Sequence, residues 1–272
     1  MSDTSAVKQV ICINWGTRYG ARFINRLYGG VARNITGPFT FTCFTDTRDG
    51  IRPEVICEDL PEMGAEMPKN TKGKWPKSRL WSERLADLTG PVLFLDLDLV
   101  ITGNIDDFFT YGDPDDVILS RNAAKPFERV GQTSVFRFPV GKLKPLQDRF
   151  RADPQGVADE YRYEQRFVTR NAPGGVKLFP RGWVAHFRYQ CMPPLPLNYL
   201  IPARLPRQTK IVIFPGGVLP EHAIAGGWAG FEGQGALDHL RSISKRDPND
   251  SVSRYLRHFM LPTPWVSEHW RE

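Results

Sequence analysis

Two aspartates follow directly on a short apolar run near the middle of the chain. Residues 91–107 read PVLFLDLDLVITGNIDD, and residues 92–95 are all apolar. Such a run is typical of a strand inside a parallel sheet that is covered on both faces. Asp96 and Asp98 are two residues apart, so in extended chain their carboxylates point the same way. Because ligands of open α/β sheets bind at the carboxyl edge of the strands, this stretch predicts both a fold class and a candidate site.

The two carboxylates suggest a cation site. Neighbouring carboxylates repel each other, and a cation between them removes that repulsion. Oxygen ligands favour Mg²⁺ or Mn²⁺, which also bind phosphate oxygens. The sharper interpretation is therefore a metal site for a substrate diphosphate at Asp96 and Asp98. The plainer one is a strand that ends in two solvated aspartates, and the D-x-D pattern alone does not decide between them.

The order of the apolar segments predicts an α/β fold. Residues 7–14 and 39–45 resemble buried strands, and residues 21–33 carry apolar side chains at helical spacing between them. A β-α-β start of this kind indicates a parallel sheet. Further strands are expected at residues 54–57, 117–120, 134–138, 176–179 and 210–214 and helices at residues 143–151 and 158–170. Another helix should begin at Pro76 and carry Leu80, Trp81, Leu85 and Leu88 on one face.

Composition sets limits on what the protein can be. The chain has 272 residues, and its 41% hydrophobic and 12% aromatic content indicates a packed core. We expect one domain over residues 1–235 and a helical extension of it over residues 236–272. The net charge of +6 suits a phosphorylated substrate, an anionic membrane surface or nucleic acid. No nucleic-acid motif is recognisable, so a nucleic-acid partner is not expected.

The start of the chain and its cysteines point to one compartment. Residues 1–15 lack the basic and apolar regions of a signal peptide, and no apolar run approaches the length of a membrane span. The four cysteines are widely spaced and three lie in strand-like segments, which favours buried thiols. The expectation is a cytoplasmic protein.

A longer pattern around the aspartates is more specific than the D-x-D. Residues 75–109, WPKSRLWSERLADLTGPVLFLDLDLVITGNIDDFF, resemble glycosyltransferases of the GT-A fold, especially family 8, which includes glycogenin. That family has a lysine-bearing helix, a strand ending in D-x-D and a following N-I-D-D turn. The Q-T-S-V-F segment from Gln132 and the E-Q pair at Glu164 are weaker matches. The resemblance spans about residues 7–215 and implies a mixed, mostly parallel central sheet flanked by helices.

The resemblance also implies an activity and a set of site residues. Family members move a sugar from a nucleotide donor, commonly a UDP-sugar, to a saccharide or lipid-linked acceptor with retention of configuration, using Mn²⁺ or Mg²⁺. By position, the implied metal ligands are Asp96 and Asp98, with Asp96 also near the donor. The other implied residues are Lys77 at the donor sugar or phosphates, Tyr19 with the backbone of Gly16 and Thr17 at the base, Gln132 at the donor sugar or acceptor, and Glu164 near the anomeric carbon.

Each implied role has a plainer alternative. Lys77 can be a solvated lysine at a helix start, and Tyr19 can pack on the sheet edge. Glu164 can belong to a helix-surface network with Arg162 and Arg166. Asp106 and Asp107 are expected to cap the next helix rather than to bind metal.

One family feature is missing. The family supplies a metal-binding histidine after a late strand, where this chain has Pro215. Either two aspartates, phosphate oxygens and water suffice, or His222 or His258 takes the place of that histidine. The departure leaves open a transferase-like binding protein without turnover. A phosphatase of the haloacid dehalogenase type is a weaker alternative, because its D-x-D normally continues with Gly-Thr and here Leu99-Val100 follows.

The C-terminal segment suggests a further contact. Val252, Tyr255, Leu256 and Phe259 can share one helical face, with basic residues nearby. One hypothesis is a helix that docks on anionic lipid near the acceptor. The alternative is a terminal helix that packs on the core.

Overall fold

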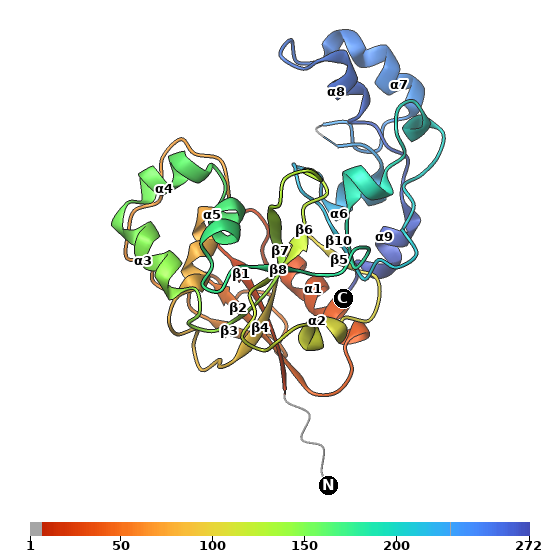
Figure 1. The fold of residues 1–272 in the computed structure, drawn as a ribbon. Helices are drawn as coiled ribbons and strands as arrows, with labels where there is room; N and C mark the ends of the chain where they lie inside the picture. The colour runs from red at the N-terminus through yellow and green to blue at the C-terminus, as the bar shows by residue number, and fades with distance from the viewer. Residues whose placement is uncertain (1–6, 229) are drawn as a thin grey trace.

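A twisted central sheet organises the molecule. The computed structural model describes residues 7–228 and 230–272, and its larger sheet has the strand order β3-β2-β1-β4-β7-β6-β8 (Figure 1). The strands are β1 (Lys8–Asn14), β2 (Phe39–Thr45), β3 (Ile56–Glu58), β4 (Pro91–Leu95), β6 (Ile118–Arg121), β7 (Gly131–Pro139) and β8 (Lys177–Leu178). The first four are parallel, whereas β7 runs antiparallel to both β4 and β6. The expected mixed, mostly parallel sheet is confirmed.

Apolar side chains cover both faces of this sheet. In β4, Leu93 and Leu95 belong to one buried cluster, and Val92 and Phe94 belong to another on the opposite face. The alternation follows from the two-residue period of a strand. It explains why this strand reads as an unbroken apolar run.

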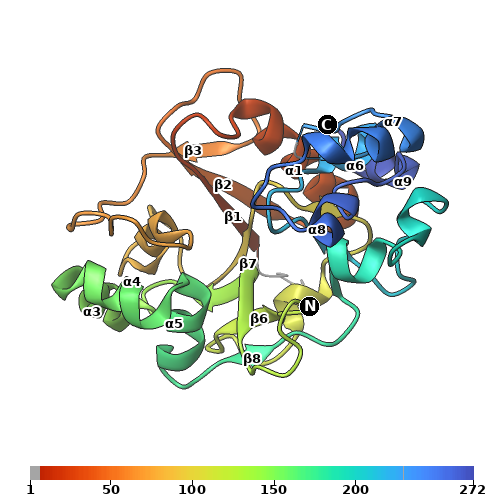
Figure 2. The ribbon, with the colours of Figure 1, turned by 90° about the horizontal axis from the view of Figure 1, so that it is seen from above.

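Helices flank the sheet on its two sides, as the view from above shows (Figure 2). On one side lie the 3₁₀ helix η1 (Trp75–Trp81) and the helices α3 (Lys144–Ala152), α4 (Pro154–Tyr161) and α5 (Glu164–Asn171). On the other side, α1 (Ala21–Asn34) packs Phe23, Ile24, Leu27 and Val31 into the core. This is the α/β arrangement that the β-α-β start predicts.

A second, small sheet and the C-terminal helices extend the α1 side. The sheet has the order β5 (Val100–Ile101), β10 (Ile211–Ile213), β9 (Val184–His186). Short helical segments follow: η2 (Phe187–Cys191), η3 (Leu197–Tyr199), α6 (Pro220–Ala225), α7 (Ala236–Arg241), η4 (Ser242–Lys245), α8 (Val252–Leu256) and α9 (Pro264–His269). After α9, Trp270 packs edge-on against Phe23 of α1, with ring centroids 5.2 Å apart. No helix in the described ranges has the length and apolarity to cross a membrane.

Two predicted helices differ from the structure. The helix at Pro76 is a 3₁₀ helix that ends at Trp81, after which Leu85 and Leu88 pair in a tight turn with Ala86 at a φ of 47°. The helical spacing of these leucines therefore reflects packing in that turn and not a continued helix. The helix expected over residues 158–170 is instead two helices, α4 and α5, because Arg162 between them adopts a left-handed φ of 63°.

The expected caps at Asp106 and Asp107 also differ. Asp106 precedes the one-turn helix α2 (Asp107–Thr110), but its side chain makes no cap bond and instead accepts from Lys8, Thr36 and Asn104. It therefore ties the start of β1 to the turn after β5. Asp107 forms an ion pair with Lys210.

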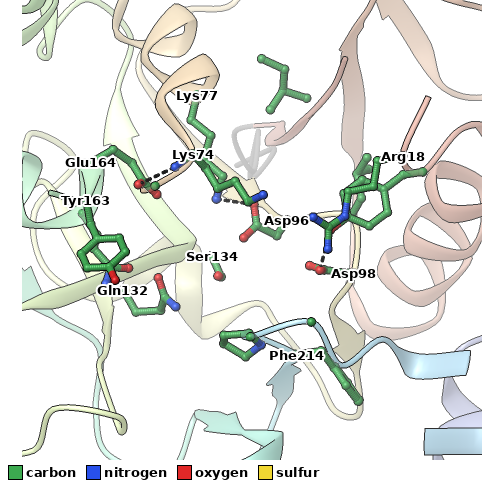
Figure 3. A pocket seen from close by; sticks show the side chains of 18 of the residues that line it. Arg18, Lys74, Lys77, Asp96, Asp98, Gln132, Ser134, Tyr163, Glu164 and Phe214 are labelled. Carbon is green, nitrogen blue, oxygen red and sulfur yellow. Dashed lines mark hydrogen bonds and ion pairs between the residues drawn. The ribbon is translucent and has the colours of Figure 1, made fainter. Parts of the chain in front are cut away.

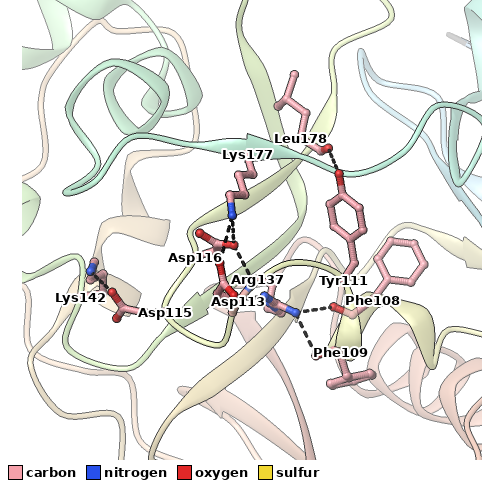
Figure 4. A network of polar contacts seen from close by, with 10 residues as sticks. All are labelled: Phe108, Phe109, Tyr111, Asp113, Asp115, Asp116, Arg137, Lys142, Lys177 and Leu178. Atoms are coloured by element: carbon pink, nitrogen blue, oxygen red, sulfur yellow. Dashed lines mark hydrogen bonds and ion pairs between the residues drawn. The ribbon is translucent and has the colours of Figure 1, made fainter.

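A buried arginine holds the other end of α2 (Figure 4). Arg137 of β7 is 1% exposed and donates to the carbonyl oxygens of Phe108, Phe109 and Asp113 at 3.3, 2.9 and 2.5 Å. The carbonyls of Phe108 and Phe109 belong to α2, where they have no partner within the helix, and that of Asp113 lies in the turn after it. The guanidinium thus anchors the turn after α2 to the sheet.

The four cysteines are free thiols, most of them inside the protein. Cys12, Cys43 and Cys191 are buried and Cys57 is partly buried, all as free thiols, which confirms the expectation.

In the C-terminal segment, Tyr255 and Phe259 are buried, each about 1% exposed. Half of the predicted apolar face therefore packs inside the protein.

Candidate functional site

A cavity of about 480 Å³ opens at the carboxyl end of β4. Its wall combines the residues after β1, the start of η1, the end of β4, the first half of β7, the start of α5 and the loop after β10 (Figure 3). The site-forming side chains are Arg18, Tyr19, Lys74, Lys77, Asp96, Asp98, Gln132, Ser134, Tyr163, Glu164 and Gln165. The cavity thus lies where parallel strands of an α/β sheet end, which is where such sheets bind ligands.

The two aspartates project into this cavity from the end of β4. The backbone N–H of Asp96 donates to the carbonyl of Ser134 at 3.0 Å, which extends the β4–β7 pairing by one residue. Its carboxylate forms an ion pair with the Lys77 ammonium at 2.5 Å. The carboxylate of Asp98 accepts a hydrogen bond from the Tyr19 hydroxyl at 2.7 Å. Among the described residues, each carboxylate keeps one oxygen without a hydrogen-bond partner.

Lys77 reaches the aspartates because of the local fold before it. Pro76 lies in the first turn of η1, where its fixed backbone angle suits a helix, and this 3₁₀ helix directs Lys77 towards the end of β4. The side chain is buried against Phe94, with Nζ 5.2 Å from the ring centroid. A lysine is rarely buried without a partner, so the solvated alternative for Lys77 does not match its position.

Burial and charge set the protonation of these groups. Burial raises the pKa of Asp98 to about 6, and the nearby Asp96 charge adds to the rise. Burial lowers the pKa of Lys77, but the charges of Asp96 and Glu164 outweigh it, so the net pKa is raised. Burial and the Asp98 charge also raise the pKa of Tyr19. At neutral pH the site therefore holds a protonated Lys77 and a protonated Tyr19.

Glu164 lies at the first turn of α5 and is buried. It accepts a hydrogen bond from the backbone N–H of Lys74 at 2.9 Å and one from the Thr133 hydroxyl at 3.3 Å. Gly73 allows the close approach, since a Cβ there would lie 3.1 Å from a Glu164 carboxylate oxygen. Glu164 is thus a fixed side chain in the cavity wall, and the alternative of a helix-surface network with Arg162 and Arg166 does not match its environment.

Only some of the other expected site residues line the cavity. Gln132, from β7, lines the cavity together with Tyr19. Gly16 and Thr17 do not line it, and the Gly16 N–H donates to Asp46 instead. Pro215 lines the cavity where the resemblance expects a histidine. Of the two substitute histidines, His222 bonds the backbone of Leu219 and His258 packs on Trp228, and neither lines the cavity.

Sequence reasoning missed several lining residues. Gln165 is the second member of the E-Q pair that carries the resemblance, so a signal for it was present. Arg18 adjoins Tyr19, and Gly216 and Gly217 follow Pro215 with φ values of 85° and 89°. Apolar periodicity could not show that Tyr163 lines the cavity, because its position depends on the break between α4 and α5.

Asp96 and Asp98 supply only part of the oxygen ligands that a divalent ion requires. The described residues contain no group of three or more His, Cys, Asp or Glu side chains placed to hold a metal ion. Asp96 and Asp98 nevertheless line the same cavity, and each has one carboxylate oxygen that accepts no hydrogen bond from the described residues. Mg²⁺ and Mn²⁺ accept water and phosphate oxygens as remaining ligands. The residues fit an ion that completes its coordination with a bound diphosphate.

Comparison of the sequence with known proteins gives no match, neither among protein-family models nor among curated proteins. Comparison of the structure with solved structures does give matches. The galactosyltransferase LgtC, solved with donor and acceptor sugar analogs, has a TM-score of 0.52 at 15% identity over 79% of this chain and 89% of its own.

Two larger glycosyltransferases are also similar. GlyE from Streptococcus pneumoniae TIGR4 has a TM-score of 0.57 at 13% identity, covering 97% of this chain and 64% of its own. The bifunctional glycosyltransferase WbbM has a TM-score of 0.55 at 9% identity, covering 80% of this chain and 47% of its own. At these identities the likeness concerns the fold. The chain therefore has the fold of solved glycosyltransferases, as the resemblance of its aspartate stretch implied.

Proposed function

We propose that the protein is a glycosyltransferase that moves a sugar from a nucleotide donor, most simply a UDP-sugar, to a saccharide or lipid-linked acceptor. The observation that carries the proposal is the Lys77–Asp96 ion pair beside Asp98 and Glu164, in one cavity at the end of β4. The shared fold with solved glycosyltransferases supports it. The phosphatase alternative is not favoured, because its D-x-D usually stands near the start of the domain, whereas here β1, β2 and β3 precede β4.

Lys77 is the proposed partner of the departing diphosphate. When the glycosidic bond of the donor breaks, negative charge develops on the leaving phosphate oxygen. A buried ammonium stabilises that charge more than water does, since it is already oriented and lies in a region of low dielectric. Arg18 and Lys74 line the same cavity and add positive charge.

Asp96 and Asp98 are the proposed ligands of Mn²⁺ or Mg²⁺. Such an ion, when bound, supplies charge stabilisation on the phosphate oxygens. Because the protein offers two carboxylates and Pro215 in place of a histidine, we expect weak metal binding to the free protein and tighter binding when a diphosphate is present. Tyr19 then fixes the orientation of Asp98 through its hydroxyl.

Glu164 and Gln132 are the proposed residues at the sugar. Glu164 is held by Lys74 and Thr133, so its carboxylate keeps one position while substrate binds. A fixed carboxylate can stabilise the positive charge that develops at the anomeric carbon. Gln132 offers an amide to a sugar hydroxyl. Retention of configuration follows from the resemblance and is part of the proposal.

A peripheral membrane contact is proposed for the C-terminal region, together with a cytoplasmic location. Leu237 of α7 and Val252 of α8 are 67% and 45% exposed, and the same two helices carry the exposed Arg241 and Arg254, which are ion-paired with Asp238 and Asp250. Exposed apolar side chains next to basic ones favour anionic lipid. Flotation with phosphatidylserine vesicles tests this: wild type should float at low salt, and the L237S/V252S double variant should not.

Calorimetric titration of UDP with and without Mn²⁺ tests the main proposal. We expect UDP to bind in Mn²⁺ and to lose most of its affinity in Asp98→Asn. Asp115→Asn, which removes an exposed carboxylate far from the cavity, is the matched control. Binding of UDP without transfer from any UDP-sugar would favour a transferase-like binding protein. Absence of UDP binding in both conditions would contradict the proposal.

A further inference from the structure

A half-buried arginine lies behind the loop that follows β10, which forms one wall of the cavity. Arg188 belongs to the π-helix η2, directly after β9. π-helices are rare, and many of them occur at functional sites. The Arg188 guanidinium lies over the ring of Trp228, with Cζ 5.5 Å from the ring centroid. The attraction between cation and ring holds the guanidinium in a defined place.

The guanidinium also lies against the cavity wall itself. Residues 214–217 of the loop after β10 line the cavity. A Cβ atom on Gly216 would lie 3.1 Å from Nη1 of Arg188. Because Gly216 has no side chain, the guanidinium is separated from the cavity at this point by backbone alone, and it can reach a ligand past that backbone.

The protein supplies no counter-charge for Arg188. Within residues 7–228 and 230–272, its side chain contacts Trp228 but forms neither an ion pair nor a hydrogen bond. Its charge acts on two histidines instead. Burial lowers the pKa of His186 to about 4 and that of His258 in the same direction, and the charge of Arg188 adds to both changes. A charged group that loses part of its water without gaining a partner is costly, and a bound anion removes that cost.

Two backbone donors stand next to this guanidinium. The N–H groups of Gly216 and Gly217 donate to no acceptor in the part of the chain that the structure describes. Both residues line the cavity. Backbone N–H groups in irregular turns and arginine side chains are groups that proteins use to bind phosphate. The chemistry of the loop and of Arg188 therefore points to the same kind of ligand.

The loop lies at the proposed donor end of the cavity. In Figure 3, Phe214, where the loop begins, lies towards Asp98, whereas Tyr163 and Glu164 lie on the other side of the cavity. Asp98 is a proposed ligand of the ion that binds the donor diphosphate. An anion that reaches Arg188 from the cavity is therefore at the diphosphate and not at the sugar.

We propose that Arg188 binds the diphosphate of the nucleotide donor from behind Gly216. The inference rests on the proposed function, since it adds a binding residue to the same site. A guanidinium offers two parallel N–H donors to two phosphate oxygens, a geometry that an ammonium cannot form. Lys77 is paired with Asp96 in the free protein, whereas Arg188 has no partner there. Arg188 is thus available to the incoming diphosphate without breaking an existing ion pair.

Calorimetric titration of UDP in Mn²⁺ and saturation-transfer NMR with uridine test the inference. Arg188→Met removes the charge and keeps a long apolar side chain over Trp228. It should weaken UDP binding about 10- to 100-fold, the scale of one hydrogen bond to a charged group. Uridine binding should be unchanged, because uridine has no phosphate. Arg188→Lys keeps the charge without the paired donors, so its UDP affinity should lie between those of Arg188→Met and the wild type.

Arg207→Met is the matched control, because Arg207 is exposed and precedes β10, whereas the cavity loop follows that strand. It should bind both ligands as the wild type does. Arg188→Gln is a second neutral variant that should repeat the loss, and thermal unfolding without ligand verifies that each variant is folded. Equal UDP affinity in the wild type and the folded neutral variants, or an equal loss for uridine, would overturn the inference. Absence of UDP binding in the wild type refutes the proposed function as well, whereas intact UDP binding that does not depend on Arg188 refutes only this inference.

Discussion

The Lys77–Asp96 ion pair leads to a prediction in which one substitution strengthens the binding of metal and weakens the binding of nucleotide. The ammonium contacts the carboxylate that is also the proposed metal ligand, at 2.5 Å and with little exposure of either side chain. A divalent ion that binds the free protein is repelled by this ammonium and competes with it for the charge of Asp96. Lys77→Met should therefore strengthen binding of Mn²⁺ alone, although it weakens binding of UDP by removing a phosphate contact.

The size of the effect follows from the contact that is lost. A hydrogen bond between charged groups contributes about 1.5–3 kcal/mol. Since about 1.4 kcal/mol corresponds to a tenfold change in affinity, Mn²⁺ should bind roughly 10- to 100-fold more tightly to Lys77→Met. The loss of UDP affinity in Mn²⁺ should be of the same order.

Electron paramagnetic resonance of free Mn²⁺ measures the first quantity without nucleotide, and calorimetry with UDP measures the second. Lys245→Met, which removes an exposed lysine of η4, is the control and should change neither. Unchanged or weaker Mn²⁺ binding in Lys77→Met would refute the reasoning. Thermal unfolding in EDTA verifies that the variant is folded.

Four further changes test the site and the fold. Asp96→Asn should remove Mn²⁺-dependent UDP binding in calorimetry, and it should lower the unfolding temperature of the folded protein because buried Lys77 loses its charged partner. Glu164→Gln should keep UDP binding but lower the transfer rate by about 10²-fold, the scale of one lost electrostatic group, in a steady-state assay. Arg137→Met should lower the free energy of unfolding in urea by about 3 kcal/mol, because several buried carbonyls lose a charged donor. Burial lowers the pKa of His239 to about 4. The unfolded chain takes up the proton first, so stability should fall from about pH 6.5 to pH 4, and less so in His239→Phe.

The sequence indicates the sheet and the centre of the site, for a physical reason. A strand buried on both faces must be apolar throughout, so residues 92–95 identify β4 without further information. Asp96 and Asp98 follow it, and the two-residue period brings them to one side. Such local rules need only neighbouring residues, which is why β4 lies where the sequence predicts it and both aspartates line one cavity.

Other parts depend on contacts between distant segments. Residues 158–170 have helical spacing throughout, and nothing local shows that Arg162 adopts a left-handed conformation. That break packs Tyr163 against Gly73, which lies 90 positions earlier in the chain. The short 3₁₀ helix η1 is similar: Leu85 and Leu88 have helical spacing but lie in a turn after it, Leu85 buried and Leu88 partly buried. In each case tertiary packing overrides the intrinsic preference of the segment.

The position of the last residues has a consequence for the order of folding. Arg33 of α1 donates to the carbonyl oxygens of His269, Arg271 and Glu272, up to 239 residues away in sequence. Trp270 covers Phe23 on the same helix. During synthesis α1 leaves the ribosome long before residues 269–272, so part of its apolar surface stays open until these residues follow. Contacts of such long range are formed late, so the growing chain should depend on chaperones longer than its compact fold suggests.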